Sequence, residues 1–179
     1  VAASCPAGPA FEGGGIVCGM PALDGAIERV TIDDQGDVTI EVIGNTTPKG
    51  LCGSGLVDLM SELLRTGRMN AQGRFAEGMA RFQVHEPDVV FTESDVNQLA
   101  QAKGANVAGL RIVADVFGIA LEDIDRFYLA GGFALHIDPR AAKRIGLIPM
   151  LPDEKIARVG NAALQGASRA LLSQTLRRD

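Results

Sequence analysis

Residues 126–138 read R-F-Y-L-A-G-G-F-A-L-H-I-D, and this stretch decides the fold class. Its first five residues are mostly apolar and predict a short strand, which Gly131 and Gly132 follow at once. A loop is expected next, and then a helix that begins at Asp138-Pro139 and runs through Arg144. Because ligands of α/β sheets bind at the carboxyl ends of strands, the glycine pair is a candidate ligand contact. A tight turn with no ligand explains it equally well.

A long helix is predicted upstream of this unit, from a cap at Thr92 or Ser94 to a stop at Gly118. The inward stripe of this helix would consist of Val96, Leu99, Lys103, Val107, Leu110, Ala114 and Phe117. Lys103 is the unusual member, because a lysine on an apolar stripe must reach water, pair with a carboxylate or meet a ligand. The neighbouring Gly104 costs about 1 kcal/mol relative to alanine in a helix, which suggests close packing or a contact there.

The first half of the chain predicts a hairpin followed by a helix. Two alternating apolar runs between residues 25 and 43 are separated by D-D-Q-G, a typical hairpin pattern. A helix then opens at residues 53–55 and ends at Gly67, after the segment G-L-C-G-S-G. Its N-terminus would suit an anion, but the P-loop lysine is absent and an ordinary helix start fits as well. Residues 68–91 are interpreted as a small insert with short strands at 81–85 and 89–91.

The end of the chain predicts a final helix from about Val159 to Leu176. Its small residues would allow another element to pack closely against it: Gly160, Ala162, Ala163, Gly166, Ala167 and Ala170. Helices alternate with short strands in the second half, which implies a mixed sheet with helices packed on it. The length of 179 residues fits one α/β domain.

Composition narrows the function classes. The formal net charge of −5 does not favour a nucleic acid or an anionic membrane as partner. No apolar run approaches the ~20 residues that span a bilayer. The start, V-A-A-S-C-P, has neither an initiator methionine nor a basic region, so it is not a signal peptide and indicates a sequence from within a longer one.

Three cysteines and two histidines do not form a metal-binding pattern. Cys5, Cys18 and Cys52 lie far apart, no C-x-x-C occurs, and His85 and His136 lie far from one another in the sequence. This argues against a zinc site or an iron–sulfur cluster within the chain and favours free thiols of a cytosolic protein. No histidine lies near Cys52 in sequence, so we interpret it as a small buried residue rather than a nucleophile.

The first twenty residues are interpreted as an ordered loop rich in small side chains. Within it, Phe11-Glu12-Gly13-Gly14-Gly15 places three glycines beside a carboxylate. Such a segment suits a contact with a ribose or a phosphate, and suits a loop without a ligand equally.

Six segments together resemble one family closely. The ATP-dependent reductive activators of corrinoid proteins, members of the actin, heat-shock chaperone and sugar-kinase superfamily, have similar segments in the same order. The first two below are fairly specific to the family, and the similarity extends from Ser4 to Ser173. The segments are A-G-P-A-F-E-G-G-G-I (7–16), G-L-C-G-S-G-L-V-D-L (50–59), L-A-Q-A-K-G-A-N-V-A-G-L (99–110), Y-L-A-G-G-F (128–133), I-G-L-I-P (145–149) and V-G-N-A-A-L-Q-G-A (159–167).

The resemblance implies a ribonuclease H-like fold, with residues 1–179 as the C-terminal half of an actin-like ATPase domain and residues 68–91 as its insert. The glycine-rich phosphate motifs and an iron–sulfur domain would lie upstream of Val1. The final helix would match the second connecting helix, which moves when the two lobes close.

The resemblance also implies site residues. Gly131 and Gly132 match the adenosine motif, and Lys103 matches the lysine on the adenosine side of the cleft. Gly13 and Gly14 would approach the ribose, with Glu12 nearby. Phe133 follows the glycine pair and stands where the chaperone relatives carry a hydroxyl residue, so a hydroxyl contact is not expected there.

The function implied is the nucleotide-binding part of a cytoplasmic activator that uses ATP with Mg to drive reduction of Co(II) to Co(I). The partner would be a corrinoid protein or a cobalamin-dependent methyltransferase. A homodimer of the activator itself is one assembly that we consider. The chain alone is expected to hydrolyse ATP weakly or not at all, and its sequence identifies no catalytic residue and no metal ligand. Two alternatives stay open: a kinase or ATP-dependent hydrolase of the same superfamily, and a non-catalytic docking module.

Overall fold

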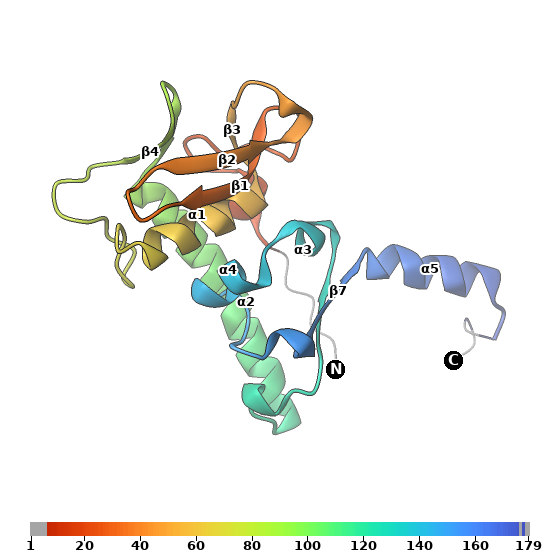
Figure 1. Cartoon of the computed structure of the whole chain (residues 1–179). Helices are drawn as coiled ribbons and strands as arrows, with labels where there is room; N and C mark the ends of the chain where they lie inside the picture. Colours follow the sequence, from red (N-terminus) through yellow and green to blue (C-terminus); the bar gives the residue numbers. More distant parts are fainter. Residues whose placement is uncertain (1–6, 176, 178–179) are drawn as a thin grey trace.

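The computed structural model describes residues 7–175 and residue 177. Figure 1 shows a body built from the N-terminal hairpin and helices α1 and α2, with a second unit beside it and a last helix that extends away from both. Three separate sheets are present in the described residues, where the sequence had predicted one mixed sheet. Four short 3-10 turns connect the elements: η1 (Pro9–Glu12), η2 (Ile43–Asn45), η3 (Leu121–Asp123) and η4 (Asp153–Lys155).

The predicted hairpin is confirmed as β1 (Ala26–Ile32) and β2 (Val38–Val42), which pair antiparallel. At its turn, an oxygen of the Asp33 carboxylate accepts hydrogen bonds from the backbone N–H groups of Gly36 and Asp37 at 2.7 and 2.8 Å. A further strand, β3 (Gly50–Leu51), pairs parallel with β1 and was not predicted. Two residues are too few for an alternating pattern, so sequence alone gives no signal for it.

Helix α1 (Gly53–Arg65) packs across β1 and forms the centre of the core. Leu56, Leu59 and Leu63 are fully buried. The glycines at its start allow this close approach, because a Cβ at Gly55 would lie 2.2 Å from the carbonyl oxygen of Ile27. Packing therefore accounts for the glycines of the G-L-C-G-S-G segment. The N-terminus of α1 is buried, so it offers no open site for an anion.

The insert contains β4 (Phe82–His85) and β5 (Val89–Phe91), an antiparallel pair close to the predicted bounds. Helix α2 (Glu93–Phe117) follows, and Thr92 is its cap. The Thr92 hydroxyl accepts from the Asp95 backbone N–H at 3.3 Å, while the Asp95 carboxylate accepts from the Thr92 backbone N–H at 2.9 Å. This reciprocal pair is a capping box, and it fixes where the helix begins.

The predicted stripe of α2 is buried only in part. Val96, Leu99 and Ala114 are buried, whereas Phe117 is 59% exposed, so its predicted inward orientation is wrong. The body covers the N-terminal part of α2, and the exposed residues of its last turns include Val116. The end of the helix is therefore apolar without being enclosed.

The second unit begins with β6 (Phe127–Ala130), as predicted. The expected loop after the glycine pair is instead a five-residue helix, α3 (Gly132–His136), and the predicted helix α4 (Pro139–Arg144) follows. Strand β7 (Ile156–Gly160) pairs parallel with β6. Val159 therefore lies in a strand, and the final helix α5 (Ala162–Leu172) begins later than predicted because Gly160, at φ 64°, ends the strand just before it. The helix ends at Leu172, and Leu176, its predicted end, lies outside the described residues.

Burial differs sharply between the core and the last helix. The largest fully buried side chains come mainly from β1, α1, the insert and the start of α2, whereas no residue of α5 is buried. Leu164, Leu171 and Leu172 of α5 are 61%, 73% and 88% exposed. The small residues of α5 contact no other element closely within the described part of the chain, and none of its helices is both long and apolar enough to cross a membrane.

Candidate nucleotide site and a charged cavity

Three glycine-containing segments from distant parts of the sequence meet at one point. The ring of Phe133, just after the glycine pair, lies 5.8 Å from the ring of Phe11 in η1, measured between centroids. A Cβ at Gly53 would lie 2.6 Å from the Phe133 ring and 2.3 Å from the Phe11 carbonyl oxygen. The start of α3 is thus held against η1 and the start of α1. Phe133 has a packing role here, and its predicted place in the nucleotide site stays a prediction.

Gly131 and Gly132 differ in why the fold uses glycine. Gly131 has φ 107°, a conformation that L side chains rarely adopt, and its N–H donates to the Gly160 carbonyl at 2.6 Å. Gly132 has no positive φ, and a Cβ there would meet no atom within 4 Å. The turn explains Gly131. Neither backbone conformation nor packing in the described residues requires glycine at position 132. The space beside its Cα, at the start of α3, is open.

Gly13 and Gly14 have a local explanation. Gly13 has φ 89°, and a Cβ there would lie 2.5 Å from the backbone nitrogen of Met20. At Gly14 a Cβ would lie 3.1 Å from the Pro9 carbonyl oxygen. The loop therefore needs glycine at the first position and favours it at the second, while Glu12 beside them is exposed. The predicted ribose contact stays a prediction.

Lys103 makes a contact that the sequence did not predict. The half-buried side chain donates from Nζ to the carbonyl oxygen of Ile145 at 3.0 Å, which joins α2 to the end of α4. The amino group also lies 3.9 Å from the position that a Cβ of Gly146 would take. Gly104 next to it is exposed and has open space around it. The predicted place of Lys103 on the adenosine side of the cleft stays a prediction.

Cys52 is 2% exposed at the start of α1, where its thiol lies 3.4 Å from the Ile27 carbonyl oxygen and from the Ser54 hydroxyl. This agrees with a small buried residue. Cys18 is half-buried, and Cys5 lies outside the described residues. Within residues 7–175 and 177, no group of three His, Cys, Asp or Glu side chains is placed to hold a metal ion.

A cavity of about 340 Å³ opens between the two units, and the sequence did not predict it. One side is formed by β1 and α1, with Arg29, Asp58 and Glu62, and the other by α4 and β7, with Arg144 and Arg158. None of Lys103, Gly131 and Gly132 lines it. Asp58 was the available signal, because it is a carboxylate inside the apolar run V-D-L of a buried helix.

Asp58 is a buried carboxylate of this cavity with few polar partners. It is 7% exposed, its Oδ2 lies 3.5 Å from Nη1 of Arg29, and its buried Oδ1 has no hydrogen-bond partner among the described residues. Burial raises the pKa of Asp58 to about 6, against the opposing effect of Arg29. The carboxylate is therefore less well compensated than its neighbours.

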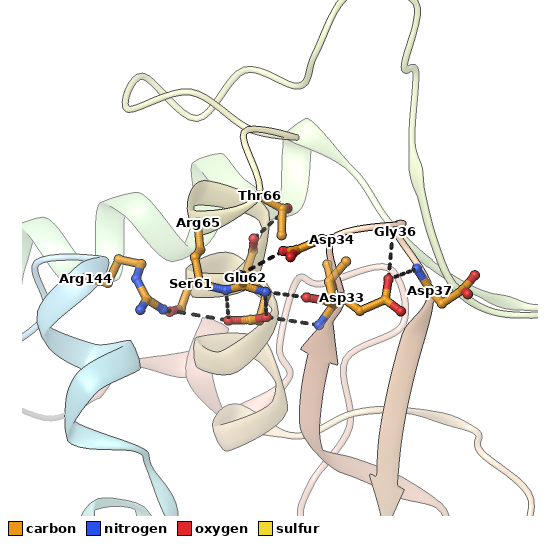
Figure 2. A network of polar contacts seen from close by, with 10 residues as sticks. Asp33, Asp34, Gly36, Asp37, Ser61, Glu62, Arg65, Thr66 and Arg144 are labelled. Carbon is orange, nitrogen blue, oxygen red and sulfur yellow. Dashed lines mark hydrogen bonds and ion pairs between the residues drawn. The ribbon is translucent and has the colours of Figure 1, made fainter.

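Glu62, one turn further along α1, is fully compensated (Figure 2). Its carboxylate accepts from Nε and Nη2 of Arg65 at 2.9 and 2.8 Å and from the Ile32 backbone N–H at 3.0 Å. Nη1 of Arg144 lies 3.7 Å away and also donates to the Ser61 hydroxyl at 2.5 Å. The hydrogen bonds from Arg65, above all, lower the pKa of Glu62. One side chain thus links β1, α1 and α4.

A second hollow of about 170 Å³ lies one helical turn along α2 from Lys103. It is lined by Val107, Leu110 and Arg111 of α2 and by the segment 146–150 that follows α4. The I-G-L-I-P segment singled out in the sequence thus forms a mostly apolar wall opposite α2.

Comparison with known families now decides the fold. The family model described as the C-terminal domain of RACo, the ASKHA domain, matches residues 1–179. The chain belongs to this family. The ASKHA assignment agrees with the predicted actin-like fold, in which a mixed α/β arrangement binds a nucleotide.

Solved and curated relatives agree with the assignment. A reductive activator for corrinoid, iron–sulfur protein matches with a TM-score of 0.84 and 39% identity, over 97% of this ASKHA chain and 31% of that chain. The corrinoid activation enzyme RamQ of Eubacterium limosum is 35% identical over 96% of this chain and 33% of its own length. The [Co(II) methylated amine-specific corrinoid protein] reductase of Methanosarcina barkeri is 26% identical over 98% and 36%. The ASKHA chain thus spans about a third of the length of these relatives.

Proposed function

We propose that this chain is the nucleotide-binding, C-terminal half of an actin-like ATPase domain in an ATP-dependent activator of corrinoid proteins. The family match over residues 1–179 carries the proposal, together with relatives that are named for corrinoid activation and reduction. Co(II) in the corrinoid would be the substrate, and its reduction to Co(I) the outcome. The electron would come from an iron–sulfur domain in a part of the protein outside this chain.

Gly132 supports the nucleotide part of the proposal. The start of α3 is fixed by the contact of Phe133 with Phe11, while the position of Gly132 itself faces open space. An anchored backbone with a bare Cα allows a flat ring or a ribose to lie directly against the main chain. Gly104 on α2 offers a second bare position that packing does not explain.

Within the proposal, the chain positions the nucleoside and does not cleave the phosphates. Gly131 and Gly132 would lie against the adenosine, Phe133 would hold their helix in place, and Lys103 would support the adenosine side of the cleft through its bond to Ile145. Gly13 and Gly14 would line the ribose side. ATP with Mg would supply the free energy that changes the affinity of the domain for its partner.

The partner would be a corrinoid protein or a cobalamin-dependent methyltransferase. The names of the curated relatives support a corrinoid protein. A homodimer and a cytoplasmic location are further predictions. Neither a nucleic acid nor a membrane is proposed as partner, because the net charge is −5.

Calorimetric titration of the full-length protein with ADP tests the site. Gly132→Val places a branched side chain where the nucleotide would lie, and we expect at least tenfold weaker binding. Gly166→Val is the matched control, because Gly166 also lies in a helix with open space around it but far along α5. Equal affinities of the two variants would show that Gly132 does not face the nucleotide.

The same titration separates the alternatives. Absence of heat with both ATP and ADP, with retained binding to a corrinoid protein, would support a docking module. Phosphate transfer from ATP to a sugar or another small acceptor would support a kinase. Nothing in the described residues favours either alternative over the activator.

A further inference from the structure

Helix α3 is too short to hold its own shape. It has five residues, Gly132–His136, and an isolated helix of this length is unstable in water. The backbone position of Gly132, the proposed nucleotide contact, therefore depends on the elements that hold α3 in place. Its start is held by the ring of Phe133, whose centroid lies 5.8 Å from that of Phe11. Its end needs contacts as well, because the carbonyl groups of the last turn lack partners within a helix.

Strand β7 supplies these contacts through Arg158. Nη1 of Arg158 donates to the carbonyl oxygen of Leu135 at 3.2 Å and to that of Ile137 at 3.5 Å. Leu135 lies in the last turn of α3, and Ile137 is the residue that follows the helix. Because a guanidinium group is always protonated, both hydrogen bonds are charge-assisted. One side chain of β7 thus serves the end of α3.

Gly160, the last residue of β7, contacts the same helix on both sides. Its carbonyl oxygen accepts from the N–H of Gly131, just before α3, at 2.6 Å. A Cβ at position 160 would lie 3.3 Å from Cδ1 of Leu135, so this side chain lies against the bare Cα of Gly160. Any substitution of Gly160 would strain the backbone at φ 64°. Arg158 is therefore the part of this contact that can be changed without straining the main chain.

We propose that Arg158 is a positioning residue of the nucleotide site, which keeps Gly132 in place by holding the end of α3. Arg158 acts through the helix, because it lines the charged cavity, whereas neither Gly131 nor Gly132 does. If α3 adopts the binding geometry for only a fraction of the time, the apparent Kd rises by the inverse of that fraction. Arg158 has this role only if Gly132 contacts the nucleotide, so the role rests on the proposed function.

Calorimetric titration of the full-length protein with ADP measures the effect of Arg158→Met, which keeps an apolar stem and removes every donor. We expect about tenfold weaker binding, as for a helix that is ordered about a tenth of the time. Arg158→Lys should bind ADP more tightly than Arg158→Met, because an ammonium group can donate to the same carbonyl oxygens. Arg140→Met is the matched control and should leave the Kd unchanged, since this 77% exposed side chain of α4 pairs with Asp153.

Hydrogen exchange without nucleotide separates positioning from a general loss of stability. In Arg158→Met, the amides of residues 131–137 should exchange at least threefold faster than in the wild type, while those of α1 keep their rates. Faster exchange in α1 as well would show a general loss of stability and would overturn the local role. Unchanged exchange in residues 131–137 would overturn it too.

The titrations distinguish failure of this role from failure of the site itself. Unchanged ADP affinity in Arg158→Met, with weaker binding in Gly132→Val, would overturn the role of Arg158 and leave the nucleotide site intact. Equal losses in Arg158→Lys and Arg158→Met would show that the hydrogen bonds to the carbonyl groups do not matter, which also overturns the role. Equal affinities of Gly132→Val and Gly166→Val would overturn the proposed site, and the role of Arg158 with it.

Discussion

Helices α1 and α5 differ most in how far they are buried. Helix α1 buries most of its residues against β1, α4 and η1, whereas no residue of α5 is buried and the strands β6 and β7 form a sheet of their own. Parallel sheets are normally covered on both faces, and two strands alone are marginal. The buried residues of α4 and of the segment after it belong to the same core as those of α1, so the two units share one core, to which α5 contributes no residue.

The largest expected effect concerns ATP hydrolysis, which the proposal assigns to motifs outside this chain. The isolated chain should hydrolyse ATP at least a hundredfold more slowly than the full-length protein, because the proposal places the phosphate-binding motifs outside it. Phosphate release under saturating ATP measures this. Comparable turnover by the isolated chain would contradict the proposal that hydrolysis depends on motifs outside it.

Two leucine truncations test the difference in burial between α1 and α5. Leu59→Ala, at a fully buried position of α1, should lower the free energy of unfolding by about 3 kcal/mol. Leu172→Ala, at an 88% exposed position of α5, should change it by less than about 0.5 kcal/mol. Urea denaturation of the isolated chain gives both values. Similar losses would show that α5 packs against the body after all.

A smaller effect is expected from the boundary between the units, at Asp58. Because burial raises the pKa of Asp58 to about 6, the native state binds a proton on this carboxylate at a higher pH than the unfolded chain does. The contribution of Asp58 to stability is therefore greatest in acid, is lost as the pH rises from about 4 to 6, and stays unfavourable above that.

Asp58→Asn removes this dependence. Relative to the wild type, the variant should be more stable at pH 8 than at pH 5, by a difference of about 1 kcal/mol. Chemical denaturation at the two pH values measures it, and Asp125→Asn serves as the exposed control. A difference of the opposite sign would mean that Arg29 outweighs burial.

The sequence predicted the parts of the fold that depend on neighbouring residues. The hairpin, α1, the strands of the insert and the cap of α2 at Thr92 follow from alternation, helical spacing and capping chemistry within a short stretch. Family membership was also confirmed, because six ordered segments carry more information than any one of them. Strand β7 was missed because its partner β6 lies about thirty residues upstream, Phe127 pairing with Ile156.

The candidate site, like the fold, could be predicted only where the signal lies in neighbouring residues. The sequence could not distinguish glycines that serve packing, such as Gly53 and Gly55, from Gly132, because the distinction depends on which atoms approach in space. The charged cavity was missed for the same reason, since Asp58 and Arg144 meet only when α1 and α4 pack together. Contacts of Lys103, Gly131 and Gly132 with a nucleotide stay predictions.

Gly160 has a mechanical consequence. It is the last residue of β7, which pairs with β6, and has φ 64° just before α5, no residue of which is buried. The 11 residues of α5 make a lever about 16 Å long. A rotation of about 20° at this joint would move the far end by roughly 6 Å, about the pitch of one helical turn. A modest change of backbone torsion at one residue would thus become a displacement large enough to change the contacts of a docked protein.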